Sequence, residues 1–209
     1  MSKNLVLIGY RGTGKSTIAR LLAERLGMPR VSFDEEIVRR AGMGIPEIVQ
    51  ERGWPGFRDL EEEVVADLAA RDGQVLDTGG GVVTRPANLE RLRTGGVVFL
   101  LESRIEDIVR RIGGDDQRPS LTGARSITDE VVEVLAQRGP LYRAAAHHRI
   151  DTSALSPEDG AREIARIFAE STGRADGGAS LGPARASGGP RPQDPPQPNG
   201  PGCRRATET

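Results

Sequence analysis

The feature that most constrains this sequence is a glycine-rich motif near its first residues. Residues Gly9–Ser16 read Gly-Tyr-Arg-Gly-Thr-Gly-Lys-Ser and match the pattern G-x-x-x-x-G-K-S/T in full. The apolar run Leu5–Ile8 before it is typical of a strand buried on both faces. From Thr17 to the stop at Gly27, apolar residues recur at helical spacing. Strand, glycine-rich loop and helix in this order predict a phosphate-binding P-loop.

The chemistry of the motif predicts ATP binding. Glycines let successive backbone N–H groups turn toward a phosphate with no Cβ in the way. Lys15 can reach the β- and γ-phosphates, Ser16 can coordinate Mg²⁺, and the helix N-terminus adds its dipole. We therefore predict Mg²⁺ as the cofactor, and ATP binding by Gly12, Thr13, Gly14, Lys15, Ser16 and Thr17.

The rest of the chain alternates short apolar runs with stretches of helical periodicity. Further strands are predicted at Pro29–Phe33, Gln74–Asp77, Val97–Leu101 and Arg149–Asp151. Helices are predicted at Asp34–Ala41, Ile45–Gly53, Arg58–Arg71, Pro86–Arg93, Ile105–Ile112, Thr128–Tyr142 and Pro157–Glu170. Because such alternation implies right-handed βαβ crossovers, we predict an α/β fold with a parallel β-sheet flanked by helices.

Three groups of candidate functional residues directly follow predicted strands. They are the P-loop, Asp34 at the start of a helix, and the triple glycine Gly79–Gly81. Parallel sheets bind ligands beyond the carboxyl ends of their strands. We therefore expect these three groups to meet at one edge of the sheet.

Composition and charge narrow the class of protein. The chain has 209 residues, a comfortable size for one α/β domain, and a net charge of −1, so bulk charge recruits neither nucleic acid nor an anionic membrane. Its single cysteine, Cys203, excludes an intramolecular disulfide and fits a reducing compartment. The apolar run Leu5–Ile8 is too short for a signal peptide core or a membrane span. We expect a soluble cytoplasmic protein with small-molecule partners.

The last part of the chain has a different composition. From Gly173 onward, glycine and proline dominate and apolar side chains are nearly absent. Such a segment cannot offset its own ordering entropy. We predict a folded domain at residues 1–172 and a disordered tail at residues 173–209.

Several residues outside the P-loop suit a small acidic acceptor. Arg58 and Glu61 lie one turn apart on a predicted helix, and Gly79–Gly81 exposes backbone N–H groups after a strand. Arg118 lies in an aperiodic segment, where it can close over a transferring phosphate, and Arg138 lies beside a helix break. Each of these alone is better explained as a solvated surface arginine or a turn; their joint order along a P-loop chain favours an acceptor site.

In this order, the motifs resemble shikimate kinase, a family of small P-loop kinases of the nucleoside-monophosphate-kinase-like group. The resemblance runs from about Leu5 to about Phe168. Its residues are Gly9–Thr17, Asp34, Phe57-Arg58 with Glu61, Gly79–Gly81, Arg110, Arg118-Pro119, Arg138 with Pro140-Leu141-Tyr142, and Asp151-Thr152 with Pro157.

The resemblance implies transfer of a phosphoryl group from ATP to the 3-hydroxyl of shikimate, a step of chorismate and aromatic amino-acid biosynthesis. It implies that Asp34 binds the acceptor hydroxyls and accepts the proton. Arg58 and Arg138 would hold the shikimate carboxylate with help from Gly79–Gly81. Two guanidinium groups suit this task because each donates bidentate hydrogen bonds to a carboxylate.

The same resemblance assigns the nucleotide side and the regions of the domain. Arg118 would reach over the phosphates as a catalytic residue beside Lys15, Arg110 would pack on adenine, and the loop around Pro157 would lie on its other side. The acceptor-binding region would span residues 33–63 and a lid residues 113–125. The size and the family together suggest a monomer.

The sequence departs from the family at the metal site. The family usually has Asp-x-Asp after the second strand, whereas this chain has Ser32-Phe33-Asp34. Asp77 lies at the end of the next strand. Our hypothesis is that Asp77 replaces the missing carboxylate near Mg²⁺; the alternative is that it only caps the glycine turn.

Two other functions stay open at this stage. One is a kinase for another small carboxylic or hydroxy acid, such as gluconate, on the same scaffold. The other is an ATP-binding regulatory module without turnover, which the retained Asp34 and Arg118 disfavour. Trp54, the only tryptophan, lies just before Phe57-Arg58, and we interpret it as a packing residue.

Overall fold

The computed structural model describes residues 3–113, 121–122 and 126–173, all within one unit, Met1–Gly177. In the described part, five strands form one parallel sheet in the order β2-β3-β1-β4-β5. The strands are β1 (Asn4–Ile8), β2 (Arg30–Ser32), β3 (Val75–Asp77), β4 (Gly96–Glu102) and β5 (His148–Asp151). This architecture confirms the predicted α/β fold.

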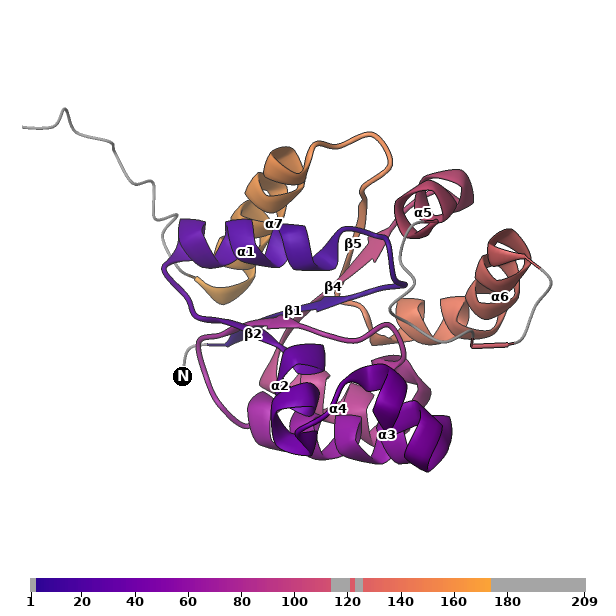
Figure 1. The fold of residues 1–209 in the computed structure, drawn as a ribbon. Helices are drawn as coiled ribbons and strands as arrows, with labels where there is room; N and C mark the ends of the chain where they lie inside the picture. Colours follow the sequence, from indigo (N-terminus) through magenta and orange to yellow (C-terminus); the bar gives the residue numbers. More distant parts are fainter. Residues whose placement is uncertain (1–2, 114–120, 123–125, 174–209) are drawn as a thin grey trace, which may run out of the picture. The chain divides into compact units, whose positions relative to one another are not determined.

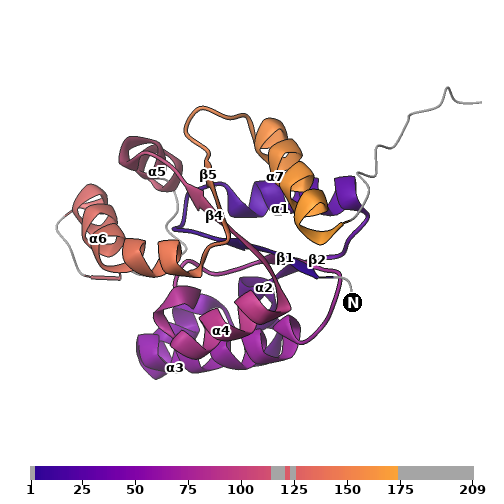
Figure 2. The ribbon, with the colours of Figure 1, turned by 180° about the vertical axis from the view of Figure 1, so that it is seen from behind.

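Helices cover both faces of the sheet (Figures 1 and 2). They are α1 (Lys15–Leu26), α2 (Phe33–Ala41), α3 (Ile45–Ala69), α4 (Pro86–Gly95), α5 (Ile105–Ile112), α6 (Ile127–Ala145) and α7 (Pro157–Thr172), with a 3₁₀ turn, η1 (Val82–Thr84). Helices α1 and α7 lie on one face, and α2, α3 and α4 lie on the other (Figure 1). The chain therefore has the three layers expected of parallel βαβ units.

The alternation of side chains along β1 produces two separate cores. Leu5 and Leu7 pack with the apolar residues of α1 and α7, whereas Val6 and Ile8 pack with those of α2, α3 and α6. Successive side chains of a strand point to opposite faces, so a run of four apolar residues serves both layers. The central strand that carries the P-loop is thus buried on both faces.

The predicted helices and strands are all present, with differences of a few residues at their ends, and η1 is the one element that was not predicted. The predicted helices Ile45–Gly53 and Arg58–Arg71 both belong to α3. Gly53 interrupts α3 with φ 66° and ψ 176°. This positive φ, which glycine adopts without strain, starts a new helical segment at Trp54. Gly173 ends α7, whereas residues 174–209 of the predicted tail and most of the predicted lid lie outside the described residues.

Among the described residues, no helix combines the length and the apolar character that crossing a membrane requires.

Candidate active site

The P-loop adopts a conformation that only its glycines permit. Gly9, Gly12 and Gly14 have φ of 142°, 79° and 90°. A Cβ on Gly9 would also collide with the carbonyl oxygen of Leu101 on β4. Lys15 is buried, and its Nζ donates to the carbonyl oxygens of Gly9 at 2.9 Å and of Tyr10 at 3.0 Å. The loop therefore holds its own lysine inward, in the concavity that the pattern predicts for phosphate.

A cavity opens in front of this loop at the carboxyl ends of β1, β2 and β3. We call it the P-loop cavity; it is lined by Arg11, Gly12, Gly14, Lys15, Ser16, Thr17, Ser32, Asp34, Asp77, Thr78, Gly80, Arg111 and Ile112. The strand order places β3 between β1 and β2, which brings the three predicted groups together. Ser16 and Thr17 belong to the first turn of α1 and are exposed to solvent within this cavity.

One side of the P-loop cavity holds Asp77, and the register explains its position. Ser32 on β2 is the direct partner of Asp77 on β3. Asp77 is buried and accepts a hydrogen bond from Arg30 at 3.1 Å, while Arg30 also donates to Glu35 at 2.9 Å. Ser32 instead caps α2, accepting from the Glu35 backbone N–H at 3.3 Å. The register thus places the Asp77 carboxylate beside Ser32, one strand away.

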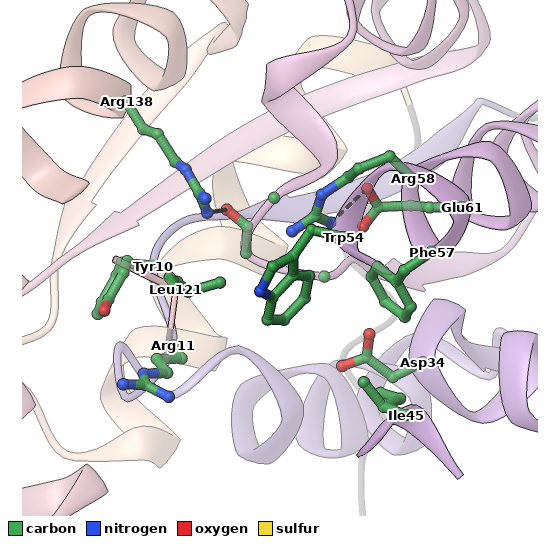
Figure 3. A pocket seen from close by; sticks show the side chains of 13 residues that line it. Tyr10, Arg11, Asp34, Ile45, Trp54, Phe57, Arg58, Glu61, Leu121 and Arg138 are labelled. Carbon is green, nitrogen blue, oxygen red and sulfur yellow. Dashed lines mark hydrogen bonds and ion pairs between the residues drawn. The ribbon is translucent and has the colours of Figure 1, made fainter. Parts of the chain in front are cut away.

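A second cavity, drawn in Figure 3, shares lining residues with the first. We call it the aromatic cavity; it is lined by Tyr10, Arg11, Asp34, Ile45, Trp54, Phe57, Arg58, Glu61, Gly79, Gly80, Gly81, Leu121 and Arg138. Arg11, Asp34 and Gly80 line both cavities. The two cavities therefore meet at these three residues.

Arg58 is held rigidly in the wall of the aromatic cavity. Its Nη1 donates to Glu61 Oε2 at 2.7 Å, and its guanidinium carbon lies 5.0 Å from the Phe57 ring centroid and 5.5 Å from that of Trp54. Glu61 is fully buried, and burial raises the pKa of its carboxyl although the neighbouring Arg58 acts to lower it. A Cβ on Gly81 would meet this guanidinium, so a larger residue there would displace the Arg58 side chain. The arginine is preorganised before any ligand arrives.

The triple glycine is fixed from the opposite side by α6. Arg138 Nη1 donates to the Gly80 carbonyl oxygen at 3.3 Å, and the hydroxyl of Tyr142 donates to the same oxygen. Burial raises the pKa of Tyr142 and keeps its hydroxyl a donor. With the Gly80 carbonyl turned toward α6, Arg58 and Arg138 approach the aromatic cavity from two different elements (Figure 3).

The remaining predicted residues lie as follows. Gly12, Thr13 and Gly14 belong to the P-loop, and the buried Thr13 hydroxyl donates to the Tyr10 carbonyl oxygen at 2.8 Å. Pro157 starts α7 and does not line the P-loop cavity. Arg118 lies outside the described residues.

Arg110, predicted to pack on adenine, and its neighbour Arg111 lie in different surroundings. Arg110 is exposed, forms an ion pair with Asp107 at 2.7 Å and does not line the P-loop cavity. Arg111 does line it, and its Nη1 donates to the Gly12 carbonyl oxygen at 3.0 Å. Neighbouring residues of a helix point about 100° apart, so a shift of one residue decides which side chain faces the loop.

Several residues of the aromatic cavity carry no sequence signal for a role in the site. Trp54, interpreted from the sequence as a packing residue, lines this cavity beside Arg58. Tyr10, Ile45 and Leu121 line it too, and none of them is a fixed position of a motif. The one signal for Trp54 is its position shortly before Phe57-Arg58.

A P-loop whose cavity opens onto a second one lined by arginines and a carboxylate defines a phosphotransferase, with separate places for nucleotide and acceptor. Residues 11–169 match the family model described as "Shikimate kinase". The chain belongs to the shikimate kinase family.

Individual relatives agree with this assignment. The shikimate kinase of Rhodopirellula baltica is 40% identical over 178 residues, which cover 83% of this chain and 95% of that protein. The shikimate kinase of Nitratidesulfovibrio vulgaris is 46% identical over 145 residues, covering 68% of this chain and 82% of that protein. Among solved structures, the shikimate kinase of Acinetobacter baumannii in complex with shikimate aligns with a TM-score of 0.78 and 36% identity, over 82% of this chain and 95% of that one.

Proposed function

We propose that this chain transfers the γ-phosphoryl group of ATP to the 3-hydroxyl of shikimate, a step of chorismate and aromatic amino-acid biosynthesis. The observation that carries the proposal is the junction of the two cavities, because Asp34 and Gly80 line both of them. Membership of the shikimate kinase family supports the same acceptor. We further propose that the enzyme acts in the cytoplasm as a monomer on these small molecules.

The acceptor carboxylate is proposed to bind Arg58 and Arg138. These arginines belong to α3 and α6 and line the aromatic cavity together. A guanidinium donates two parallel hydrogen bonds to a carboxylate, and the N–H groups of Gly79–Gly81 add further donors. Such a grip leaves the ring hydroxyls to face Asp34.

Transfer itself needs positioning and charge neutralisation more than covalent chemistry. We propose that Asp34 orients the acceptor hydroxyl and takes its proton, since its carboxylate lines the junction. Lys15, already held at the P-loop, would neutralise the phosphate oxygens. We also propose that Arg118 reaches over the phosphates as a catalytic residue. This role rests on the resemblance to the shikimate kinase family, since Arg118 lies outside the described residues.

The donor set of the P-loop cavity fits Mg²⁺. Mg²⁺ prefers oxygen ligands and keeps several waters and substrate phosphates, so it needs only one or two protein groups. The described residues include no group of three or more His, Cys, Asp or Glu side chains that could hold a metal. Ser16 and Asp77, which line the cavity, would hold the ion directly and through water. When bound, Mg²⁺ neutralises charge on the phosphates.

Asp77→Asn should raise the Mg²⁺ concentration for half-maximal activity by about tenfold, the effect of losing about 1.4 kcal/mol of interaction with the ion. It should also weaken MgADP binding in calorimetry while leaving metal-free ADP binding unchanged. Asp72→Asn, in the exposed turn before β3, is the matched control. If the Mg²⁺ titration and the MgADP affinity were both unchanged, Asp77 would have no role in holding Mg²⁺. Its role would then be limited to accepting the hydrogen bond from Arg30.

On the nucleotide side we propose Arg111 in place of Arg110. Arg111→Ala should raise the KM for ATP by about threefold, because it removes an exposed hydrogen bond to the Gly12 carbonyl worth about 0.7 kcal/mol. Arg110→Ala, which removes an exposed ion pair, should change this KM by less than about twofold. If Arg110→Ala raised the KM for ATP and Arg111→Ala did not, Arg110 would be the arginine that contacts the nucleotide.

The function is tested by ADP release, measured with shikimate, gluconate and nucleoside monophosphates as acceptors. Of these, shikimate should stimulate release strongly and the others should not, and phosphorus NMR should detect shikimate 3-phosphate. Stimulation by gluconate and not by shikimate would redirect the proposal to a gluconate-type kinase. Binding of ATP and shikimate with no product from any acceptor would favour a regulatory module.

A further inference from the structure

The first turn of α6 carries a buried carboxylate, Glu130, for which the proposed reaction has no use. Its residue is 4% exposed. Burying a carboxylate is costly unless charged or polar partners compensate for the lost hydration. The partners of Glu130 therefore indicate what its position accomplishes.

The two oxygens of Glu130 contact two different parts of the site. Oε1 accepts a hydrogen bond from Arg11 Nη2 at 2.5 Å, and Oε2 accepts one from the Leu121 backbone N–H at 3.0 Å. Arg11 belongs to the P-loop and lines both cavities. Leu121 lines the aromatic cavity, where its side chain extends between Tyr10 and Trp54 (Figure 3). One buried group thus joins the nucleotide side to the wall of the acceptor side.

Glu130 is also the main restraint on Arg11 in the described part of the chain. The Arg11 side chain is 17% exposed, and its Nε is buried without a hydrogen-bond partner there. Its guanidinium carbon also lies over the ring of Tyr10, 5.9 Å from the centroid. Since Tyr10 belongs to the same loop, the Glu130 contact is the one among the described residues that ties the Arg11 guanidinium to a separate element.

We infer that Glu130 is a positioning residue that couples nucleotide binding to acceptor binding. Phosphates that order the P-loop fix Arg11 and, through Glu130, fix Leu121 against the acceptor; an acceptor packed on Leu121 restrains the P-loop by the same route. Each ligand then meets a site that the other has already ordered, so each tightens the binding of the other. Thermodynamic linkage requires the two enhancements to be equal. The inference rests on the proposed function, because it requires shikimate to occupy the aromatic cavity.

The coupling is measured on the full chain with Trp54 as reporter. Trp54 is the only tryptophan and lines the aromatic cavity, so its fluorescence reports acceptor binding. The Kd for shikimate is determined with and without saturating MgADP, and the ratio of the two values is the coupling factor. For the unmodified chain we expect a factor of about five or more, in the usual range for coupled sites.

Glu130→Gln keeps the shape of the side chain and an acceptor for the Leu121 N–H but loses the charge that holds Arg11. It should bring the coupling factor to within about twofold of one, while each ligand alone binds within about fivefold of normal. Glu133→Gln, one turn further along the exposed side of α6, is the matched control and should keep the coupling. Arg11→Gln breaks the same contact from the P-loop, and the double variant should lose no more than either single one.

Each other outcome overturns the inference. A normal coupling factor in both Glu130→Gln and Arg11→Gln, or a factor of one in the unmodified chain, removes the role of Glu130 and leaves the proposed function intact. Equal weakening of both ligands with an unchanged factor identifies Glu130 as a structural residue only. Failure of the unmodified chain to bind shikimate at all, by fluorescence and by calorimetry, overturns the proposed function together with the inference.

Discussion

Replacing Asp34 by asparagine should lower kcat for shikimate by roughly 10²- to 10⁴-fold, the usual contribution of a positioned general base. Asp34 stands in the first turn of α2 and lines both cavities. An acceptor hydroxyl at that junction lies between the carboxylate and the phosphate to be transferred. Asparagine keeps the size of the side chain and can still hydrogen-bond the hydroxyl, but it cannot take the proton. The measurement is ADP release at saturating ATP and shikimate.

A binding assay separates the loss of the base from the loss of the site. The Kd for shikimate, followed through Trp54, should rise by less than about tenfold, because asparagine keeps the hydrogen bond and only the extra strength of a charged acceptor, about 1 kcal/mol, is lost. Glu47→Gln, at the exposed start of α3, should retain full activity and serves as the control. If kcat stayed normal while Kd rose, Asp34 would be a binding residue and the base would have to be sought elsewhere.

The position of the site could be predicted from the sequence because it depends on local patterns. The P-loop, Asp34 and Gly79–Gly81 each follow a strand, and the carboxyl ends of parallel strands share one edge. What had to be predicted was only that the strands exist and are parallel. The strand order, with β3 between β1 and β2, shows which of the three groups lies in the middle. The prediction that they share one edge did not depend on this order.

Contacts that depend on register were beyond the reach of the sequence. That Ser32 and Asp77 are direct partners follows from the alignment of β2 with β3, which the hydrophobic pattern of two such short strands leaves unspecified. The contact of Arg30 with Asp77 follows from the same register. The link from Glu130 to Arg11 joins residues 119 positions apart, and no local pattern encodes it.

The direction in which a helical side chain points was likewise beyond the reach of the sequence. Trp54 turns into the aromatic cavity because Gly53, at positive φ, begins a new helical segment just before it. A glycine inside a helical pattern predicts a break but not the direction taken after it. Arg110 and Arg111 illustrate the same limit, since adjacent residues of a helix face different surroundings.

Replacing Arg58 by alanine should raise the KM for shikimate by roughly 30- to 1000-fold. The guanidinium is proposed to bind the acceptor carboxylate, and truncating a buried, hydrogen-bonded charge pair costs about 2–4 kcal/mol. The KM for ATP should stay within about threefold, because Arg58 lines the aromatic cavity and not the P-loop cavity. Steady-state kinetics with each substrate varied in turn provides the measurement, and Arg52→Ala, at an exposed position of α3, is the control.

The same substitution also affects folding, which has to be separated from binding. Glu61 is fully buried, and Arg58 is its ion-pair partner at 2.7 Å. Removing the arginine leaves an uncompensated carboxylate in the core, which should lower the free energy of unfolding by about 3 kcal/mol. A raised KM in Arg58→Ala alone is therefore open to two explanations: a lost contact to shikimate, or a loosened aromatic cavity.

The double variant Arg58→Ala/Glu61→Gln distinguishes these explanations. In the double variant both charges of the buried pair are gone. The free energy of unfolding, measured in urea, should therefore recover by more than about 1 kcal/mol, since no unpaired carboxylate is left in the core. The KM for shikimate should stay as high as in Arg58→Ala, because the guanidinium proposed to bind the acceptor carboxylate is still absent. If the KM recovered along with the stability, Arg58 would act by supporting the wall of the cavity, and Arg138 would be left as the arginine that binds the acceptor.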